Sequence, residues 1–393
     1  MIKMNFIKVI IKNVITSIFY IFRVFPIQNN KIVIVNYAGK GFGDNGKYIA
    51  LKLLEQNKKY DIVWLTTNPY DTFPKGIRRV SYYSLKSIYE QVTAKIWIDN
   101  SRKPSYVRKR KNQYYIMTWH GGIGPKKIEK EALNQLPKHY IEQAKNDARM
   151  TDLMVAESEF SYKKYKNMFW YEGEIAKCGV PRQDILFKSP KYLKVKLLKS
   201  LDITETKHIL LYAPTFRNGM KKEDLDIYHL DWNNILKAAS YKFGGEWVGF
   251  IRLHPNVAKL DRESSFEQEN VCDVTNYPDM QELLSISDIV LTDYSSCIYD
   301  FGLTGRPGFM IIKDMKDYTC QRNIGFGKHG IEIIPFPIAL DDDDLLKQIK
   351  DFNAIKYREK LHDFYVRFCG LYPGGNASTT IVKYIDDAIE NRK

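Results

Sequence analysis

The chain has 393 residues, of which 44% are hydrophobic and 13% aromatic, so it can bury more than one core and is not a disordered protein. Its formal net charge of +14 suits a nucleic acid, an anionic membrane or a phosphorylated substrate without choosing among them. Its five cysteines are scattered and form no CxxC pair, which argues against a disulfide framework or a structural zinc site and favours a reducing compartment.

The first 25 residues predict a basic amphipathic helix. This segment contains four basic residues and no acidic residue: Lys3, Lys8, Lys12 and Arg23. The first acidic residue of the chain is Asp44. The uncharged run between Lys12 and Arg23 has ten residues, fewer than the ~20 that span a bilayer. We expect this helix to lie in the interface of an anionic membrane, and the alternative is a helix packed against the protein's own core.

Short apolar runs alternate with helical segments in the first half of the chain. Strands are expected at residues 31–37, 60–66, 79–82, 94–99, 114–119 and 154–156, and helices at residues 47–56 and 85–93. The glycine-rich turn GKGFGDNG follows the first strand, but it does not meet the GxGxxG spacing. This alternation indicates a parallel sheet with helices on both faces.

The pattern breaks in a basic stretch near residues 187–206 and then restarts. Further strands are expected at residues 208–212, 247–253, 288–292 and 309–312, and helices at residues 232–240, 279–286, 295–303, 342–352, 357–368 and 377–391. We therefore expect an N-terminal segment of residues 1–27 and two α/β domains, residues 28–195 and 196–393. A ligand cleft is expected between the domains.

The motif TDYSS joins a predicted strand to a predicted helix. Asp293 follows the strand, Ser295 and Ser296 open the helix, and Asp300 lies further along it. Unpaired N–H groups at a helix start favour an anion, and ligands of open α/β sheets collect at the carboxyl ends of the strands. The alternative for Ser295 is a simple helix cap.

Two histidines also follow predicted strands, His120 in TWHGG and His254 in RLHP. The pKa of histidine lies near physiological pH, so either ring can take a proton from an attacking hydroxyl. Gly121 allows a ligand to approach the backbone closely, and Lys126 and Lys127 lie within reach of an anion. The alternative for His120 is a histidine that stabilises a turn.

Two arginines accompany these motifs. Arg252 shares a strand face with His254, and Arg217 in YAPTFR offers a planar donor fork that suits phosphate. The alternative for Arg252 is an edge charge that faces water. A Walker loop, a Ser–His–Asp order and an HExxH motif are all missing, so we expect phosphate handling by side chains and helix ends, with no required metal or cofactor.

Five motifs occur in the order TWHGG, GVPRQD, YAPTFR, RLHP and TDYSSCIYDF. Taken together, they resemble the motifs of the CDP-glycerol glycerophosphotransferase family of teichoic acid and capsule synthesis. The resemblance extends from about Lys31 to the C-terminus. It implies two GT-B-like, Rossmann-type domains that face a cleft, with the lipid-linked acceptor on the N-terminal domain and the CDP-linked donor on the C-terminal domain. Family members usually continue the first histidine motif as HGTPLK, whereas this chain reads HGGIGPKK.

Carried over by position, the resemblance implies that His120 and His254 are catalytic. An acceptor hydroxyl would attack the phosphorus next to the polyol and release CMP, with His120 as the base. The donor- and phosphate-binding set is then Arg217, Arg252, Asp293, Ser295, Ser296 and Asp300, and the acceptor or lipid side is Gly121, Lys126 and Lys127. The implied partners are CDP-glycerol and an acceptor on undecaprenyl diphosphate, and the implied place is the cytoplasmic face of the membrane, as a peripheral protein.

Other interpretations stay open at this point. One keeps the fold and replaces the donor with CDP-ribitol or another nucleotide donor of capsule synthesis. Another takes the six basic residues of RKPSYVRKRK, residues 102–111, as a nucleic-acid or membrane surface, although no nucleic-acid-binding module surrounds them. A third is an inactive scaffold, which the intact histidines argue against. The sequence leaves open the polyol, the acceptor sugar, single addition or polymerisation, and the oligomeric state.

Overall fold

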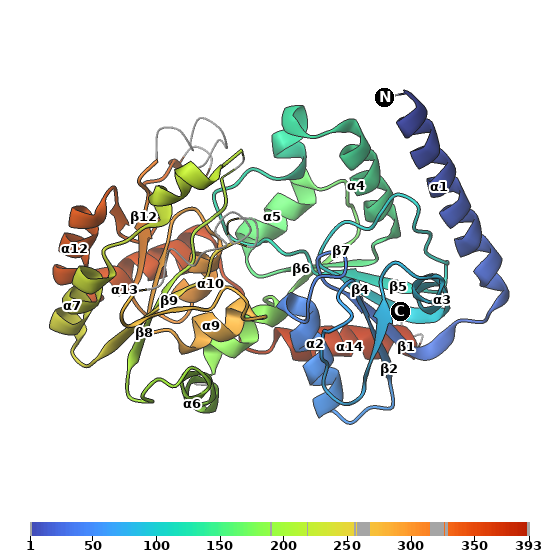
Figure 1. The fold of residues 1–393 in the computed structure, drawn as a ribbon. Helices are drawn as coiled ribbons and strands as arrows, with labels where there is room; N and C mark the ends of the chain where they lie inside the picture. Colours follow the sequence, from blue (N-terminus) through green and yellow to red (C-terminus); the bar gives the residue numbers. More distant parts are fainter. Residues whose placement is uncertain are drawn as a thin grey trace. The chain divides into compact units, whose positions relative to one another are not determined.

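The computed structural model describes residues 2–188, 191–217, 219–254, 257, 268–314, 326 and 329–390 (Figure 1). Contacts divide the chain into two compact units. The first is Met1–Gly122, Ile128–Asp184 and Leu371–Lys393, and the second is Ile123–Lys127 and Ile185–Gly370. The sequence placed the boundary between residues 195 and 196 and assigned the C-terminal helix to the second domain. The structure instead changes unit after Asp184 and returns the last segment to the first unit.

The first unit carries a sheet of seven parallel strands in the order β3-β2-β1-β4-β5-β6-β7. This order begins with the arrangement of a dinucleotide-binding sheet, in which the strand order reverses between β1 and β4. The elements are α1 (Ile2–Ile21), η1 (Phe22–Val24), β1 (Gln28–Val35), α2 (Asp44–Glu55), β2 (Asp61–Thr66), β3 (Ile77–Ser81), α3 (Leu85–Thr93), β4 (Ala94–Asp99), β5 (Tyr114–Met117), η2 (Glu129–Gln135), α4 (Lys138–Met150), β6 (Leu153–Ala156), α5 (Glu159–Met168), β7 (Glu174–Lys177), η3 (Pro181–Phe187, which runs into the second unit) and α14 (Ala377–Ile389).

Alternation along the strands divides the first unit's interior into two cores. Val33 and Val35 of β1 join one core, and Ile32 and Ile34 join the other, because successive side chains point to opposite faces. The second core includes α2 and α14, which lie side by side (Figure 1). The C-terminal helix belongs to the first unit for this reason: its apolar side chains, Ile385 among them, complete that core.

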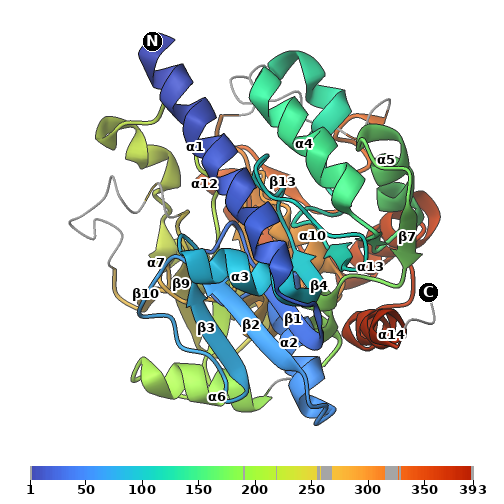
Figure 2. The ribbon, with the colours of Figure 1, turned by 90° about the vertical axis from the view of Figure 1, so that its right-hand side faces the viewer.

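The helix α1 has one face on the protein and one in solvent. Phe19 is fully buried in the first core, Ile15 packs against it, and the Thr16 hydroxyl donates to the Tyr106 carbonyl at 3.2 Å. Figure 2 shows α1 beside α3. Exposed apolar side chains lie on the opposite side of the helix, among them Ile10, Val14 and Ile21. No helix in the described part of the chain is long and apolar enough to cross a membrane.

The second unit repeats the same architecture with six parallel strands in the order β10-β9-β8-β11-β12-β13. Its strand order reverses between β8 and β11. The elements are α6 (Lys191–Ser200), β8 (His208–Tyr212), η4 (Lys222–Tyr228), α7 (Trp232–Phe243), β9 (Trp247–Ile251), β10 (Val271–Asp273), α9 (Met280–Ile286), β11 (Ile289–Thr292), α10 (Cys297–Gly302), β12 (Gly308–Ile311), β13 (Ile338–Ala339), α12 (Asp342–Lys350), α13 (Ala354–His362) and η6 (Asp363–Phe368). An α/β fold with parallel sheets, expected from the sequence, is confirmed.

Candidate functional site

The strand-order reversal of the first unit carries a polar bridge. Asn36 follows β1 and Asn100 follows β4, and the Asn100 side-chain amide donates to Asn36 Oδ1 at 2.7 Å. The Asn100 Oδ1 accepts from the backbone N–H of Tyr37 at 2.8 Å. This bridge fixes the two strand ends at the edge where ligands of such sheets bind.

His120 lies next to this bridge. Its Nδ1 is 2.8 Å from the Asn100 carbonyl oxygen, so the neutral ring donates there and keeps Nε2 as an acceptor. The ring centroid is 4.3 Å from that of Trp119 and 5.4 Å from that of Tyr37. His120 keeps access to solvent, but desolvation by the surrounding protein lowers its pKa, against the opposing effects of the Asn100 carbonyl and Asp44. The ring is therefore neutral, and a competent base, at neutral pH.

The backbone around His120 is strained. Tyr37, Ala38, Asp44 and Trp119 all have positive φ, with values of 43°, 54°, 51° and 57°. Each such residue costs on the order of 1–3 kcal/mol unless its surroundings hold it, and such residues concentrate at functional sites. The positive φ values therefore make the loops after β1 and β5 a candidate functional edge of the first unit.

Asn45 and Arg182 hold the loop that carries His120. The Asn45 side-chain amide donates to the Trp119 carbonyl at 2.9 Å, and its Oδ1 accepts from the Arg182 backbone N–H at 3.0 Å. Arg182 in turn donates from Nη1 to the His120 carbonyl at 3.2 Å. These bonds join the glycine-rich turn and the GVPRQD motif to the His120 loop and fix the position of the ring.

The glycines after His120 are required by close packing. A Cβ on Gly122 would lie 2.5 Å from Glu157 Oε1, and a Cβ on Gly121 would lie 2.9 Å from Trp119 Nε1. Glu157 is fully buried. The sequence predicted that Gly121 lets a ligand approach the backbone, and this stays a prediction; side chains of the protein lie beside both glycines.

The segment with Lys126 and Lys127 belongs to the second unit. Lys127 is exposed, and Lys126 is partly buried. Within that unit a Cβ on Gly124 would lie 3.7 Å from the Ser296 Cβ. The two lysines therefore sit on a segment that runs beside the TDYSS motif.

The reversal point of the second unit carries an ion-pair network centred on Asp293. This carboxylate, which follows β11, accepts from the backbone N–H and the hydroxyl of Thr215, both at 2.9 Å. It also accepts from Arg217 Nη1 at 2.6 Å and from the Tyr294 backbone N–H at 2.6 Å. Because Thr215 lies after β8, the network joins the two strands at which the order reverses.

Arg217 is held by two carboxylates. Besides its bond to Asp293, it donates from Nε and Nη2 to Asp314 at 2.8 and 3.1 Å. Burial alone would lower its pKa, but the hydrogen bonds and charges of Asp314 and Asp293 outweigh burial and raise that pKa. The sequence predicted a phosphate clamp here. The structure shows a guanidinium fork engaged with protein carboxylates, which is the geometry of a positioning residue.

The serines of TDYSS differ in their surroundings. Ser295 Oγ accepts from the Cys297 backbone N–H at 3.4 Å, so it serves as a weak cap of α10. Ser296 is exposed, and its hydroxyl has no hydrogen-bond partner among the described residues. Asp300 is buried and accepts from Gln281 Nε2 at 2.9 Å, which directs it toward α9. Ser296 is thus the member of the motif that can meet a ligand in this arrangement.

Arg252 and His254 follow β9, which ends at Ile251. Arg252 donates from Nη2 to the Tyr277 carbonyl at 3.2 Å. His254 is exposed, and its ring stacks on Phe216 with a centroid separation of 5.7 Å and an angle of 25°. Because β9 pairs with β8, both residues lie at the same sheet edge as Asp293.

Sequence reasoning missed several residues that build these two sites. They are Tyr37, Asn45, Asn100 and Glu157 in the first unit and Asp314 in the second. Tyr37 is the last residue of one predicted strand and Asn100 follows another, so the rule that found His120 could have found them. Asp314 could not be found in this way, because its role depends on Arg217, 97 residues away in the chain. No group of three or more His, Cys, Asp or Glu side chains in the described ranges could hold a metal ion.

Comparisons with known proteins agree with these motifs. The sequence model of the family described as CDP-glycerol:poly(glycerophosphate) glycerophosphotransferase matches residues 17–387. A teichoic acid poly(glycerol phosphate) polymerase of Staphylococcus epidermidis is 29% identical over 92% of this chain, and the match spans 51% of that protein. A teichoic acid glycerol-phosphate transferase of Staphylococcus aureus is 29% identical over 97% of this chain and 99% of its own length. The chain thus spans about half of the first relative and nearly all of the second.

A solved structure of the wall teichoic acid polymerase TagF is also similar. It has a TM-score of 0.84 and 26% identity, with 99% of this chain and 97% of that chain covered. The resemblance drawn from the ordered motifs is thereby confirmed. The chain belongs to the CDP-glycerol:poly(glycerophosphate) glycerophosphotransferase family.

Proposed function

We propose that this chain transfers glycerol phosphate from CDP-glycerol to a hydroxyl of a lipid-linked acceptor and releases CMP, in the synthesis of teichoic acid or a related surface polymer. The observation that carries the proposal is the position of the family motifs at the strand-order reversals of both sheets, His120 in the first and Asp293 in the second. The names of the similar polymerase and transferase support the same reaction.

His120 is the proposed general base. Its Nδ1 donates to the Asn100 carbonyl, which leaves Nε2 free to accept the proton of the attacking hydroxyl. Desolvation lowers the pKa of His120, so the neutral form dominates at neutral pH. Phosphoryl transfer depends mainly on positioning and charge stabilisation, so a single well-oriented base is sufficient for the proton transfer and no covalent intermediate is needed.

The second unit is the proposed donor side. The Ser296 hydroxyl is available to the donor phosphates, and the exposed His254 ring lies at the same sheet edge. Arg217 and Asp293 fix the loops after β8 and β11, and so act through position rather than by contact. Lys126 and Lys127, on the segment beside Ser296, add positive charge near the developing charge on the leaving CMP.

The proposal keeps the GT-B-like arrangement and the peripheral membrane location expected from the sequence. The peripheral membrane location is supported by the exposed apolar stripe of α1, which includes Ile10, Val14 and Ile21. The alternative of a helix packed on the core holds for the opposite face, where Phe19 is buried. One face of α1 therefore packs on the protein core, and the other is exposed for a membrane. We propose that the protein lies at the cytoplasmic face of the membrane.

The basic stretch of residues 102–111 gives less support to a nucleic-acid surface than its composition suggests. Arg102 is buried and pairs with Glu129 and Asp147, both at 3.1 Å. Lys103 is buried and pairs with Asp99 at 2.9 Å. These cations bind carboxylates of the first unit, so they are not part of an electrostatic patch for phosphates.

The experiment that tests the reaction follows a labelled polyol. The protein is incubated with membrane extract and either CDP-glycerol or CDP-ribitol that carries a label in the polyol. We expect label from CDP-glycerol to enter the lipid-linked fraction. Transfer from CDP-ribitol alone would replace the donor and keep the reaction, and transfer from neither donor would contradict the proposal.

A further inference from the structure

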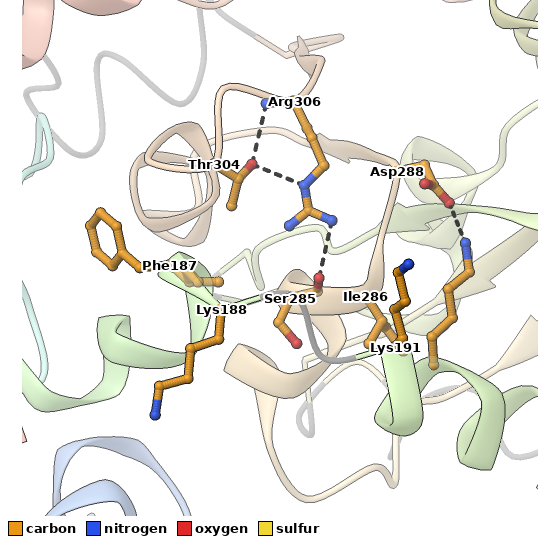
Figure 3. A pocket seen from close by; sticks show the side chains of 10 residues that line it. Phe187, Lys188, Lys191, Ser285, Ile286, Asp288, Thr304 and Arg306 are labelled. Carbon is orange, nitrogen blue, oxygen red and sulfur yellow. Dashed lines mark hydrogen bonds and ion pairs between the residues drawn. The ribbon is translucent and has the colours of Figure 1, made fainter. Parts of the chain in front are cut away.

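The second unit contains a cavity of about 420 Å³ at the sheet edge opposite the candidate site (Figure 3). Its wall includes Phe187, Lys188, Lys191, Ile286, Asp288 and Arg306. Asp288 directly precedes β11 and Arg306 precedes β12, so the cavity lies at the amino ends of the strands. Asp293 and His254 instead follow their strands, and the cavity is therefore separate from the proposed donor side.

Arg306 lines this cavity, and no carboxylate among the described residues is bonded to it. Its guanidinium donates to the carbonyls of Leu284 at 3.0 Å, Ser285 at 3.1 Å and Ser287, and to the Thr304 hydroxyl at 3.1 Å. A guanidinium has five N–H donors, and these bonds use four of them. Burial lowers the pKa of Arg306 to about 10. A buried cation of this kind is stabilised when an anion binds beside it and is buried together with it.

The carboxylate of the cavity is already engaged. Asp288 accepts from Lys194 at 2.9 Å and from the backbone N–H of Ile209 at 2.8 Å, and the His208 ring lies 3.5 Å away. Lys188 and Lys191 are exposed and have no ion pair among the described residues. Among the described residues, the cavity wall therefore carries four cations, those of Lys188, Lys191, Lys194 and Arg306, against the single carboxylate of Asp288.

Part of the remaining wall is apolar. Phe187 is 46% exposed, and Ile286 is a second apolar residue of the wall. The Lys188 ammonium group points away from Arg306 in Figure 3, but a lysine stem rotates freely enough to turn toward a bound anion. The volume lies within the range of small-molecule sites, roughly 300–1,000 Å³. An anionic group attached to an uncharged body fits this combination of walls.

We propose that this cavity binds a phosphate ester, with the phosphate between Lys191 and Arg306 and the organic part against Phe187. Charge-assisted bonds from both cations hold the phosphate. The ester comes either from a small molecule, such as glycerol 3-phosphate or CMP, or from a phosphodiester unit of the anionic polymer. The choice between these sources rests on the proposed function, whereas the site itself rests on the cavity.

The test is a calorimetric titration of the full chain with glycerol 3-phosphate, CMP and a short glycerol-phosphate oligomer. Lys188→Gln/Lys191→Gln should weaken binding about tenfold or more, because it removes two charged donors. The matched control is Lys196→Gln/Lys199→Gln, which removes the same charge from exposed positions of α6 outside the cavity wall. Binding should persist in His254→Ala, since that residue lies at the other sheet edge.

The outcomes separate the ligand sources and the two proposals. Tighter binding of the oligomer than of glycerol 3-phosphate would identify the polymer, and the reverse order would identify a small phosphate ester. Absence of binding by all three probes would overturn the proposal, and so would equal affinity in the wild type and the Lys188→Gln/Lys191→Gln protein. A failure of glycerol phosphate transfer would leave this titration unchanged, so the two failures are distinguishable.

Discussion

The two candidate sites use their side chains in different ways. His120 is presented to solvent by a strained backbone and is fixed through Nδ1, so its free nitrogen can do chemistry. Asp293 and Arg217 are largely removed from solvent and satisfy one another. In the proposed reaction, a residue of the first kind takes part directly. A residue of the second kind holds two loops in position.

The lowered pKa of His120 predicts how activity depends on pH. A neutral ring is the active form, so kcat/KM should be constant near pH 7 and fall as the pH drops through a pKa below the ordinary value of about 6.5. In Asp44→Asn the descending limb should move to still lower pH, because the Asp44 carboxylate favours the protonated ring. A pH–rate profile of both proteins checks this, and an acid limb above pH 6.5 would contradict it.

The Arg217 network gives a stability prediction. Arg217→Met leaves Asp293 and Asp314 without their cation, and breaking such a pair costs about 3–5 kcal/mol of the free energy of unfolding. Urea denaturation is the measurement. Lys221→Met is the control, since Lys221 and Glu223 form an exposed pair that should contribute less than about 1 kcal/mol. Equal stability of the two variants would show that the network is not a structural anchor.

Elements differ in how far local sequence determined them. The helix α3 and the strands β4 and β8 have the bounds that the sequence predicts, because the strands are short, mostly apolar runs and α3 begins after the capping residue Ser84. The basic stretch in which the sequence placed the domain boundary forms α6, since Leu197 and Leu198 are buried in the core of the second unit. The strands β10 and β13 have three and two residues, too few for a period to be visible.

The two faces of α1 give a prediction at this scale. Phe19→Ala should lower the free energy of unfolding by about 3 kcal/mol or more, because the ring is fully buried. Ile10→Ser/Val14→Ser/Ile21→Ser should leave that free energy nearly unchanged and reduce binding to anionic vesicles at least about tenfold, since each exposed side chain contributes roughly 1.5–3 kcal/mol when buried in lipid.

Urea denaturation and vesicle sedimentation are the two measurements for α1. Undiminished sedimentation of the triple variant would assign membrane binding to another surface. A loss of stability in the triple variant would show instead that the stripe is part of the protein's own core.

At the scale of the whole molecule, the sequence predicted two α/β units and the edges on which their functional residues lie. Those edges follow from a rule of parallel sheets, so His120, His254 and Asp293 could be found from strand ends alone. What could not be predicted is long-range. The return of α14 to the first unit depends on the fit of Ile385 to a core formed far upstream, and the pairing of Arg217 with Asp314 depends on tertiary contact.

Acceptor-dependent release of CMP from CDP-glycerol is the most direct test of the central claim. It should be compared in the wild type, His120→Ala and the control His139→Ala, which alters an exposed histidine of the first unit. We predict a loss of about 100- to 10,000-fold in turnover for His120→Ala, with the fold retained, and little change for the control. Near-normal turnover of His120→Ala, or no CMP release by the wild type, would contradict the account.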